Sequence, residues 1–404
     1  MFIPGRIEVL GKHTDYCGGR SIVCAIDRGF HAEVHEQPDS TVLLENLDIS
    51  ERIAIDLNDP KSSPGHWSNY AVEVVRRLGS NFPERLKDGV KVRFHSDLPK
   101  AAGLSSSSAL MIMVFAALDV ANDLRGSARY QDNVHDDLDL AEYLGCIENG
   151  QSFRELAGSA GVGTFGGSQD HAAIILGKMD QLSAFSFSPL RHDADFTFPD
   201  THTFVVASSG VRAEKTGAAR DSYNRVSRMV SEITGSIGKG LSLARMFEEF
   251  GVDDVLAKVR RMRSKFMTRE LLDRVEQFRI ENFEIIPAVC EMLADGNIAA
   301  IGDPIDLSQI NAERFLGNQI PETAFLQRSA REIGAVAASA FGAGFGGSVY
   351  AIVAKSDANG FMAEWKRVYA NRFSQHAGNG EFFTTRPSQR ELRAENNNEF
   401  ATRT

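Results

Sequence analysis

The sequence predicts an α+β protein, because segments with strand character and segments with helical spacing both occur along its 404 residues. Near the N-terminus, residues 5–11 and 20–36 alternate in polarity and are rich in β-branched residues, which is typical of strands around a glycine turn. From about residue 222 to 300 the apolar residues recur mainly at helical spacing. A chain of this length is long for one domain and comfortable for two.

Further elements follow between these regions. Residues 91–99 form a predicted strand that ends at Pro99, and the apolar run 109–121 predicts a buried helix. The polar segment 125–140 is expected to be a loop that becomes a helix near Asp137. A helix is predicted over 139–153, a strand over 201–210, a helix over 330–341 and a strand over 348–354. The expected domains are 1–195 and 196–388, followed by a flexible tail, 389–404.

The composition excludes several classes of partner. The net charge is −10 and no run of Lys or Arg suggests a nucleic-acid or lipid surface, so we expect neither nucleic acid nor membrane as a partner. The four cysteines are far apart and lack zinc spacing, which favours reduced thiols. The N-terminus shows no signal-peptide pattern. We therefore expect a cytoplasmic protein that is a monomer or a weak dimer.

Residues 97–109, DLPKAAGLSSSSA, lead from a strand through a glycine into a helix. Unpaired N–H groups at a helix N-terminus favour negative charge, and Gly103 allows the backbone to approach a phosphate closely. Serine hydroxyls there can add hydrogen bonds or bind Mg²⁺. The alternative is that the four serines are only helix caps. The loop is not a Walker loop, because no GK[ST] follows the glycine.

Two more glycine-rich loops have the residue types of a binding site. Residues 341–355 contain G-x-G-x-x-G, but a predicted helix precedes it and a strand follows, which is the reverse of a dinucleotide fingerprint. Either a plain tight turn or a turn pressed against a ligand or another loop fits this pattern. In residues 161–171, GVGTFGGSQDH, the glycines would leave Asp170 reachable for catalysis, although an aspartate in a loop is most often a turn or capping residue.

Residues 4–19, PGRIEVLGKHTDYCGG, hold an unusual density of polar side chains. They are similar to the galactokinase signature, whose usual form is PGRVNLIGEHTDYNGG. Residues 97–109 resemble the phosphate loop of the GHMP kinases, and GAGFGGS (342–348) resembles the C-terminal glycine motif of that family. The order of the three motifs is also the family's. The resemblance implies a two-domain GHMP kinase fold, with a ribosomal-protein-S5-like N-terminal domain and a ferredoxin-like C-terminal domain.

The resemblance also implies roles for individual residues. Asp170 matches the catalytic aspartate of the family's G-x-x-D-Q motif, and Arg6 matches the arginine beside it. Mg²⁺ would be bound by Ser106 and Glu148. The sugar would be contacted by Lys12, His13, Asp15, Gly167 and Tyr223. ATP would be bound by Gly103, Leu104, Ser105, Ser106, Ser107 and Ser108.

Two departures from the family pattern affect these assignments. His171 replaces the glutamine of the catalytic motif, and Lys12 replaces a glutamate that contacts the sugar's 6-hydroxyl. A lysine can only donate, and it would pair better with the carboxylate of a uronic acid. Alternatively, Lys12 turns to solvent or pairs with a nearby acid such as Glu8.

The resemblance implies ATP-dependent phosphorylation of a monosaccharide at its anomeric hydroxyl, with galactose the first candidate. Asp170 would accept or orient the hydroxyl proton, and Arg6 would favour the ionised carboxylate and offset charge on the phosphoryl oxygens. One alternative is a kinase of the same fold acting on another sugar, such as a uronic acid. Another is a sugar- and ATP-binding sensor without catalysis, against which the presence of both Arg6 and Asp170 argues.

Overall fold

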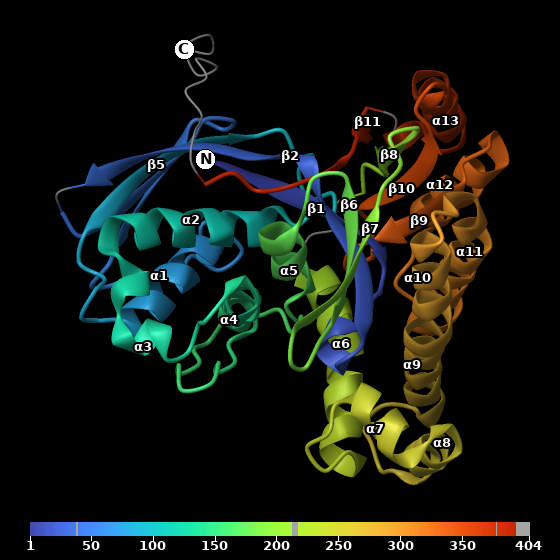
Figure 1. Ribbon diagram of the computed structural model, residues 1–404, viewed down its shortest axis with the longest axis horizontal. Helices are drawn as coiled ribbons and strands as arrows, with labels where there is room; N and C mark the ends of the chain where they lie inside the picture. Colours follow the sequence, from blue (N-terminus) through green and yellow to red (C-terminus); the bar gives the residue numbers. More distant parts are fainter. Residues whose placement is uncertain (38, 212–216, 377, 393–404) are drawn as a thin grey trace.

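The computed structural model describes residues 1–404 except 38, 212–216, 377 and 393–404. The chain forms two sheets, helices that pack beside each of them, and a group of helices that extends away from both (Figure 1). The predicted α+β class is confirmed.

The larger sheet is organised around β2, which pairs with β1, β5, β6 and β12. The main strand order is β4-β3-β5-β2-β6-β7. β3 and β5 pair in parallel, and the other pairs of this sheet in the described chain are antiparallel. The strands are β1 (Phe2–Leu10), β2 (Arg20–Gln37), β3 (Thr41–Asn46), β4 (Glu51–Asp56), β5 (Gly89–Ser96), β6 (Gln181–Ser186), β7 (Arg191–Thr197) and β12 (Pro387–Ser388).

Five helices belong to this part of the chain, and α1 and α2 lie along one face of the sheet (Figure 1). α2 is the predicted buried helix; it begins at Ser106, three residues before the predicted start, and it is buried over nearly its whole length because it packs on β1, β2 and β5. The helices are α1 (Asn69–Asn81), α2 (Ser106–Asn122), α3 (Ala128–Gln131), α4 (Asp137–Asn149) and α5 (Gln169–Leu176).

The smaller sheet has the antiparallel order β11-β8-β10-β9. Helices α12 (Pro321–Ile333) and α13 (Ala358–Arg372) pack against it around the buried Trp365, whose indole N–H donates to the carbonyl of Leu326 at 3.1 Å. The strands are β8 (His202–Ser208), β9 (Ala337–Phe341), β10 (Ser348–Ala354) and β11 (Phe382–Thr385).

The remaining helices form the region predicted to be helical, and α6 to α9 share a separate apolar core at the end remote from the sheets (Figure 1). The α-helices are α6 (Gly217–Ile237), α7 (Leu243–Phe250), α8 (Val252–Arg261), α9 (Thr268–Ile280), α10 (Ile286–Ala294) and α11 (Gly302–Asn311). Short 3-10 or π turns are η1 (Asp15–Cys17), η2 (Leu124–Gly126), η3 (Glu281–Ile285), η4 (Ile298–Ile301), η5 (Ala312–Leu316) and η6 (Ser374–His376).

The helix predicted over residues 330–341 is correct for residues 330–333 and wrong from Gly334 onward. α12 ends at Ile333 because Gly334 adopts a left-handed conformation with φ of 110°, which terminates a helix. The following residues form β9, which pairs with β10. The glycine loop 342–347 is therefore the turn of a β-hairpin.

The predicted loop 125–140 is wrong in part, because it contains the short helix α3. The predicted tail from residue 389 is held at its start, since Phe2 and Glu391 exchange two backbone hydrogen bonds of 2.7 and 2.9 Å. The rest of that tail, 393–404, lies outside the described residues. The chain changes sheets between β7 and β8, and β12 later returns to the larger sheet, which thus contains residues of both predicted domains.

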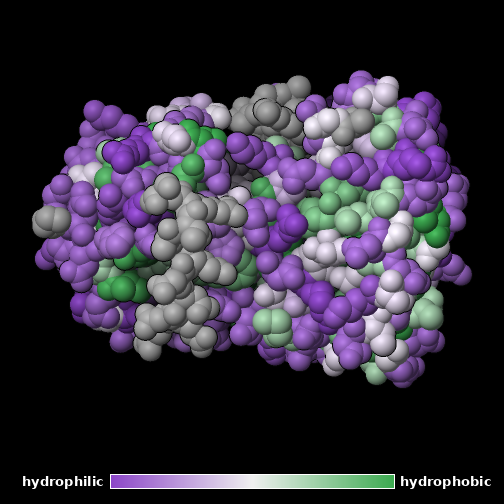
Figure 2. Space-filling view, turned by 90° about the horizontal axis from the view of Figure 1, so that it is seen from above, coloured by the Kyte–Doolittle hydropathy of each residue, from purple (hydrophilic) through white to green (hydrophobic). Residues whose placement is uncertain are grey.

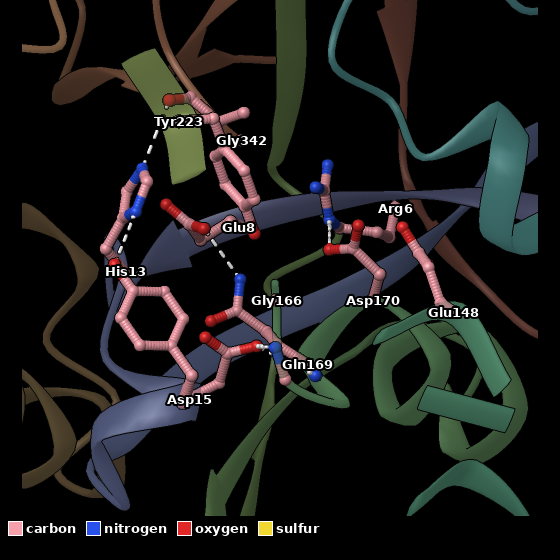
Figure 3. Close-up of a pocket in the computed structure, with 13 residues that line it drawn as sticks. Arg6, Glu8, His13, Asp15, Glu148, Gly166, Gln169, Asp170, Tyr223 and Gly342 are labelled. Carbon is pink, nitrogen blue, oxygen red and sulfur yellow. Dashed lines mark hydrogen bonds and ion pairs between the residues drawn. The ribbon is translucent and has the colours of Figure 1, made fainter. Parts of the chain in front are cut away.

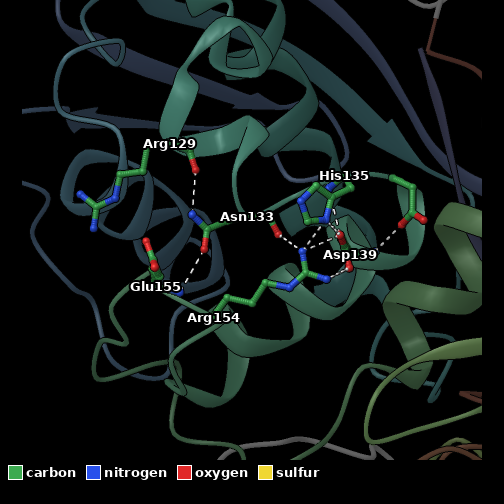
Figure 4. Close-up of polar contacts among 7 residues, drawn as sticks. Arg129, Asn133, His135, Asp139, Arg154 and Glu155 are labelled. Carbon is green, nitrogen blue, oxygen red and sulfur yellow. Dashed lines mark hydrogen bonds and ion pairs between the residues drawn. The ribbon is translucent and has the colours of Figure 1, made fainter.

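The segment after α4 is clamped to that helix by Arg154 (Figure 4). Its guanidinium donates to both oxygens of Asp139 at 2.8 and 2.6 Å and to the carbonyl of Asn133 at 2.6 Å. The backbone N–H of Glu155 donates to the Asn133 side chain at 3.0 Å. These contacts anchor the start of the segment that connects Glu148 to Asp170.

The surface seen from above is mostly hydrophilic, with hydrophobic residues in scattered groups (Figure 2). In the part of the chain that the structure describes, no helix is both long enough and apolar enough to cross a membrane.

Candidate active site

Two cavities meet at an ion pair between Arg6 and Asp170. Both residues line a small polar pocket and also a larger cavity of about 1070 Å³. Arg6 Nε lies 2.7 Å from Asp170 Oδ1, and Arg6 Nη1 donates to the carbonyl of Gly103 at 2.5 Å. Arg6 comes from β1, and Asp170 stands in the first turn of α5, where the helix dipole stabilises an anion (Figure 3). Sequence-distant segments thus place a charged pair between two binding spaces.

The serine loop is the glycine- and serine-rich segment of residues 97–109. It lines the larger cavity with Gly103, Leu104, Ser105, Ser106 and Ser107. Gly103 and Ser105 both have positive φ, of 77° and 61°. Ser105 occupies the N-cap position of α2, but its hydroxyl makes no capping hydrogen bond, and its Oγ is buried without a partner in the described chain. The helix-cap alternative is therefore not supported for this residue. Ser108, by contrast, does not line this cavity, and its hydroxyl donates to Glu148 Oε2 instead.

The glycine loop 342–347 presses against the serine loop. A Cβ on Gly342 would lie 3.0 Å from the carbonyl oxygen of Gly103 and 3.6 Å from Arg6 Nη2. Ser348 Oγ donates to the carbonyl of Ala102 at 2.7 Å. Of the alternatives that the sequence left open, the structure thus supports a turn packed on another loop.

The signature loop, residues 11–19 between β1 and β2, is held in place by side chains from α9 and η3. Arg274, buried on α9, donates to the carbonyl of His13 at 2.5 Å and contacts Cys17 Sγ at 3.0 Å. Glu281 Oε1 accepts from the backbone N–H of Gly11 at 2.9 Å. These contacts help to hold His13 at its positive φ of 58°. No motif marks Arg274 or Glu281, so sequence reasoning missed both.

Asp15 lies at the base of the small pocket, against the glycines that precede α5. Its Oδ2 accepts from the backbone N–H groups of Gly167 at 3.0 Å and Gln169 at 3.4 Å. A Cβ on Gly167 would lie 2.6 Å from that oxygen, so a larger residue cannot occupy this position without moving Asp15. Burial raises the pKa of Asp15 above its ordinary value, since a buried carboxylate loses hydration.

His13 and Tyr223 form another wall of this pocket. Their ring centroids are 5.2 Å apart, and His13 is hydrogen-bonded to the Tyr16 hydroxyl at 2.7 Å and to the carbonyl of Ala343 at 3.1 Å (Figure 3). A Cβ on Gly166 would lie 2.6 Å from the Tyr223 hydroxyl oxygen. Burial raises the pKa of Tyr223 well above its ordinary value, so the phenol is a neutral hydrogen-bonding group.

Lys12 does not line either cavity, which departs from its predicted role as a sugar contact. Its side chain is only 1% exposed, and Nζ donates to Ser308 Oγ at 3.1 Å and to Ser339 Oγ at 2.7 Å. The alternatives that Lys12 turns to solvent or pairs with a nearby acid such as Glu8 are wrong, because its buried amino group bonds to two hydroxyls from α11 and β9. Those partners lie about three hundred positions along the chain from Lys12.

Glu148 lines the small pocket and is held by hydroxyl groups. Ser108 donates to its Oε2 at 3.3 Å and Thr164 to its Oε1 at 3.2 Å, and His171 Nε2 lies 3.8 Å from Oε2. Thus Ser108, rather than Ser106, is the serine that contacts Glu148. Ser106 lines the larger cavity, and its pairing with Glu148 around a metal ion stays a prediction.

Glu8 and Gln169 were missed as site residues by the sequence analysis, although both line the small pocket. Gln169 Nε2 donates to Glu8 Oε2 at 2.6 Å. Burial, opposed by Lys12 and Arg6, raises the pKa of Glu8 to about 7. The available signal was the signature motif itself, whose usual form has asparagine where this chain has Glu8.

Family models match three parts of the chain. The GHMP kinases N terminal domain matches residues 69–178, the galactokinase galactose-binding signature residues 2–35, and the GHMP kinases C terminal model residues 285–371. Fold and site thus define the class, and the chain belongs to the GHMP kinase family. Within that family its N-terminal signature is the one of the galactokinases.

Individual relatives agree with this placement. A galactokinase of Lacticaseibacillus paracasei is 25% identical over 388 residues, which cover 93% of this chain and 91% of the relative. The crystal structure of Lactococcus lactis galactokinase complexed with galactose has a TM-score of 0.77 at 22% identity, covering 96% of this chain and 93% of the other. Methanococcus jannaschii mevalonate kinase has a TM-score of 0.60 at 14% identity, covering 96% and 98%. Because kinases with different names share the fold, the fold alone does not decide the substrate.

Proposed function

We propose that this protein transfers the γ-phosphoryl group of ATP to the anomeric hydroxyl of galactose, forming galactose 1-phosphate. The observation that carries this proposal is the position of the Arg6–Asp170 pair where the polar pocket and the larger cavity meet. A relative that shares most of the chain's length is a galactokinase, and this chain itself matches the galactokinase galactose-binding signature. The small pocket would hold the sugar, and the larger cavity the nucleotide.

In this reaction, the anomeric oxygen forms a bond to the γ-phosphorus, and the bond from that phosphorus to the bridging oxygen of ADP breaks. Asp170 would accept the proton of the hydroxyl or orient it. Arg6 would stabilise negative charge on the transferred phosphoryl oxygens, and positioning and charge stabilisation dominate such transfers. The presence of this pair between the two cavities supports a catalyst over a sensor that only binds sugar and ATP.

The remaining residues would position the sugar. Asp15 is an acceptor for sugar hydroxyls, His13 and Tyr223 provide ring surfaces and polar tips, and Gly167 leaves space beside Asp15. The backbone of residues 103–108 would bind the phosphates, because N–H groups at the start of a helix favour anions.

Mg²⁺ is expected with ATP, and the residues present fit a hard cation, because Glu148 and the neighbouring hydroxyls of Ser108 and Thr164 offer oxygen ligands. Among the described residues, no group of three or more His, Cys, Asp or Glu side chains could hold a metal ion by itself. Mg²⁺ is often bound by one or two carboxylates together with substrate phosphates, so Glu148 and Ser106 would hold it jointly with ATP. Bound there, it would neutralise phosphate charge.

The test is an ATP-consumption screen of the purified protein across free hexoses, pentoses and uronic acids. We expect galactose to give the highest kcat/KM, with a product whose phosphorus couples to the anomeric proton in the NMR spectrum. The matched control is Asp170→Asn, which should bind ATP but consume little. ATP binding without turnover on any sugar would favour the sensor instead.

A further inference from the structure

Glu8 occupies a place in the small pocket that the proposed mechanism does not use. It projects from β1, two positions after Arg6, and lies between the side chains of Tyr223 and Gln169 (Figure 3). It is only 3% exposed, yet it lines the same pocket as Asp15 and Asp170. A carboxylate placed inside a ligand pocket needs hydrogen-bond donors there.

The two oxygens of Glu8 differ in their surroundings. Oε2 accepts from Gln169 at 2.6 Å, whereas Oε1 is buried without a hydrogen-bond partner among the described residues. An ionised carboxylate is acceptor-only, so Oε1 calls for a donor from whatever occupies the pocket. A sugar hydroxyl supplies such a donor.

The charges that line the pocket favour a neutral ligand. Four carboxylates face it, from Glu8, Asp15, Glu148 and Asp170, and the guanidinium of Arg6 already bonds to Asp170 and Gly103. The amino group of Lys12, which could have attracted an anion, is occupied by Ser308 and Ser339 outside the pocket. A uronic acid would bring a further negative charge into this carboxylate-lined pocket.

We propose that Glu8 is a specificity-determining residue whose Oε1 accepts a hydrogen bond from one hydroxyl of the sugar, and that it selects a neutral sugar over a uronic acid. The proposal rests on the proposed function, because it assumes that the small pocket holds the sugar. In this chain the proposed acceptor lies at position 8, whereas the amino group of Lys12 bonds to two hydroxyls and does not line the small pocket.

The experiment compares wild type with Glu8→Gln at pH 8. Glutamine has almost the same shape but a single acceptor oxygen, which Gln169 would engage. The substrates are galactose, four monodeoxy analogues that lack the hydroxyl at C2, C3, C4 or C6, and galacturonate. A matched control is Glu45→Gln, since Glu45 is also a buried carboxylate (6% exposed) but lines neither cavity. Circular dichroism and thermal melting establish that each variant is folded.

We expect Glu8→Gln to raise the KM for galactose about ten- to a hundredfold, because a hydrogen bond to a charged acceptor is lost. Wild type should discriminate by a similar factor against one of the deoxy analogues. Glu8→Gln should lose most of that discrimination but keep the wild-type discrimination against the other three analogues. The preference for galactose over galacturonate should shrink about tenfold in Glu8→Gln and stay unchanged in Glu45→Gln.

Three results would overturn the proposal: unchanged discrimination among all four analogues in Glu8→Gln, a preference of wild type for galacturonate, or the same effects from Glu45→Gln. Failure of the proposed function has a different signature, because wild type would then phosphorylate none of these sugars. In that event the same substrate panel is measured by calorimetric binding. A galactose affinity that Glu8→Gln leaves unchanged would reject the role of Glu8, whereas a loss of about tenfold or more would support it.

Discussion

The Arg6 guanidinium contacts the Asp170 carboxylate at 2.7 Å, although 163 residues separate them in the chain. β1 brings the arginine and the first turn of α5 brings the aspartate, so the pair exists only in the folded protein. Because it borders both cavities, it is the point at which a sugar and a phosphoryl group would meet.

The first prediction concerns Asp170→Asn. Loss of the carboxylate should lower kcat about 10²-fold or more, since a positioned proton acceptor is removed, while the nearly isosteric side chain leaves ATP affinity close to wild type. Steady-state kinetics on galactose and nucleotide titration measure the two quantities. Wild-type turnover in this variant would remove Asp170 from its proposed catalytic role.

A second prediction distinguishes two serines. Ser106→Ala should raise the Mg²⁺ concentration for half-maximal activity about tenfold and weaken ATP binding, because the proposed Mg²⁺ ligand is lost. Ser108→Ala should have the smaller effect, since Ser108 acts through its hydrogen bond to Glu148. Magnesium titrations of both variants measure this difference, and the reverse order would make Ser108 the ligand.

The third prediction uses the close approach of Gly167 to Asp15. A methyl group in Gly167→Ala would lie 2.6 Å from Asp15 Oδ2, so Asp15 must move and the KM for galactose should rise about tenfold or more, with nucleotide affinity kept. Gly360→Ala on α13 is the control, because a Cβ there meets nothing within 4 Å. Equal KM values for galactose in wild type and Gly167→Ala would show that this crowding does not reach the substrate.

Lys12 supports a fourth prediction, which separates stability from specificity. Lys12→Met should change kcat/KM for galactose less than about fivefold, because the lysine lines neither cavity. Lys12→Glu should instead destabilise the fold by about 3 kcal/mol or more. It would bury an unpaired carboxylate in place of an amino group that donates hydrogen bonds to Ser308 Oγ and Ser339 Oγ. Kinetics on galactose and galacturonate, with urea denaturation, measure both effects. A switch of substrate preference in Lys12→Met would mean that the lysine contacts the sugar.

The last prediction follows from the pKa of Glu8, which burial raises from 4.5 to about 7. Between these values the unfolded chain releases the proton of Glu8 while the folded protein retains it, so stability falls as pH rises through this window. A difference of one pKa unit corresponds to about 1.36 kcal/mol, so the folding stability lost through the titration of Glu8 is about 3 kcal/mol. The free energy of unfolding is therefore measured for wild type and Glu8→Gln at pH 4.5 and 7.5. From the lower to the higher pH, the stability of the variant relative to wild type should increase. A pH-independent difference would mean that Glu8 titrates normally.

Much of the site could be predicted from the sequence because each of its loops is one short, continuous stretch of chain. The conformation of the serine loop depends on Gly103 and Ser105 themselves, and it leads directly into the helix whose N-terminus it covers. The polar strip from Arg6 to Asp15 lies in one stretch of chain, as does the glycine pair before Asp170. In such segments neighbouring residues determine both conformation and chemistry, so a motif carries most of the information.

Only the tertiary structure decided which side chains enter the pocket. Lys12 stands in the signature, but hydroxyls on α11 and β9 hold its amino group elsewhere. Glu8 and Gln169 become pocket residues because α5 packs against β1, and Arg274 locks the signature loop from α9. The sequence by itself thus determined the fold class, the family resemblance and the candidate loops. The direction of each long polar side chain depends on hydrogen-bond partners that the folded chain supplies from hundreds of residues away, and no local pattern contains them.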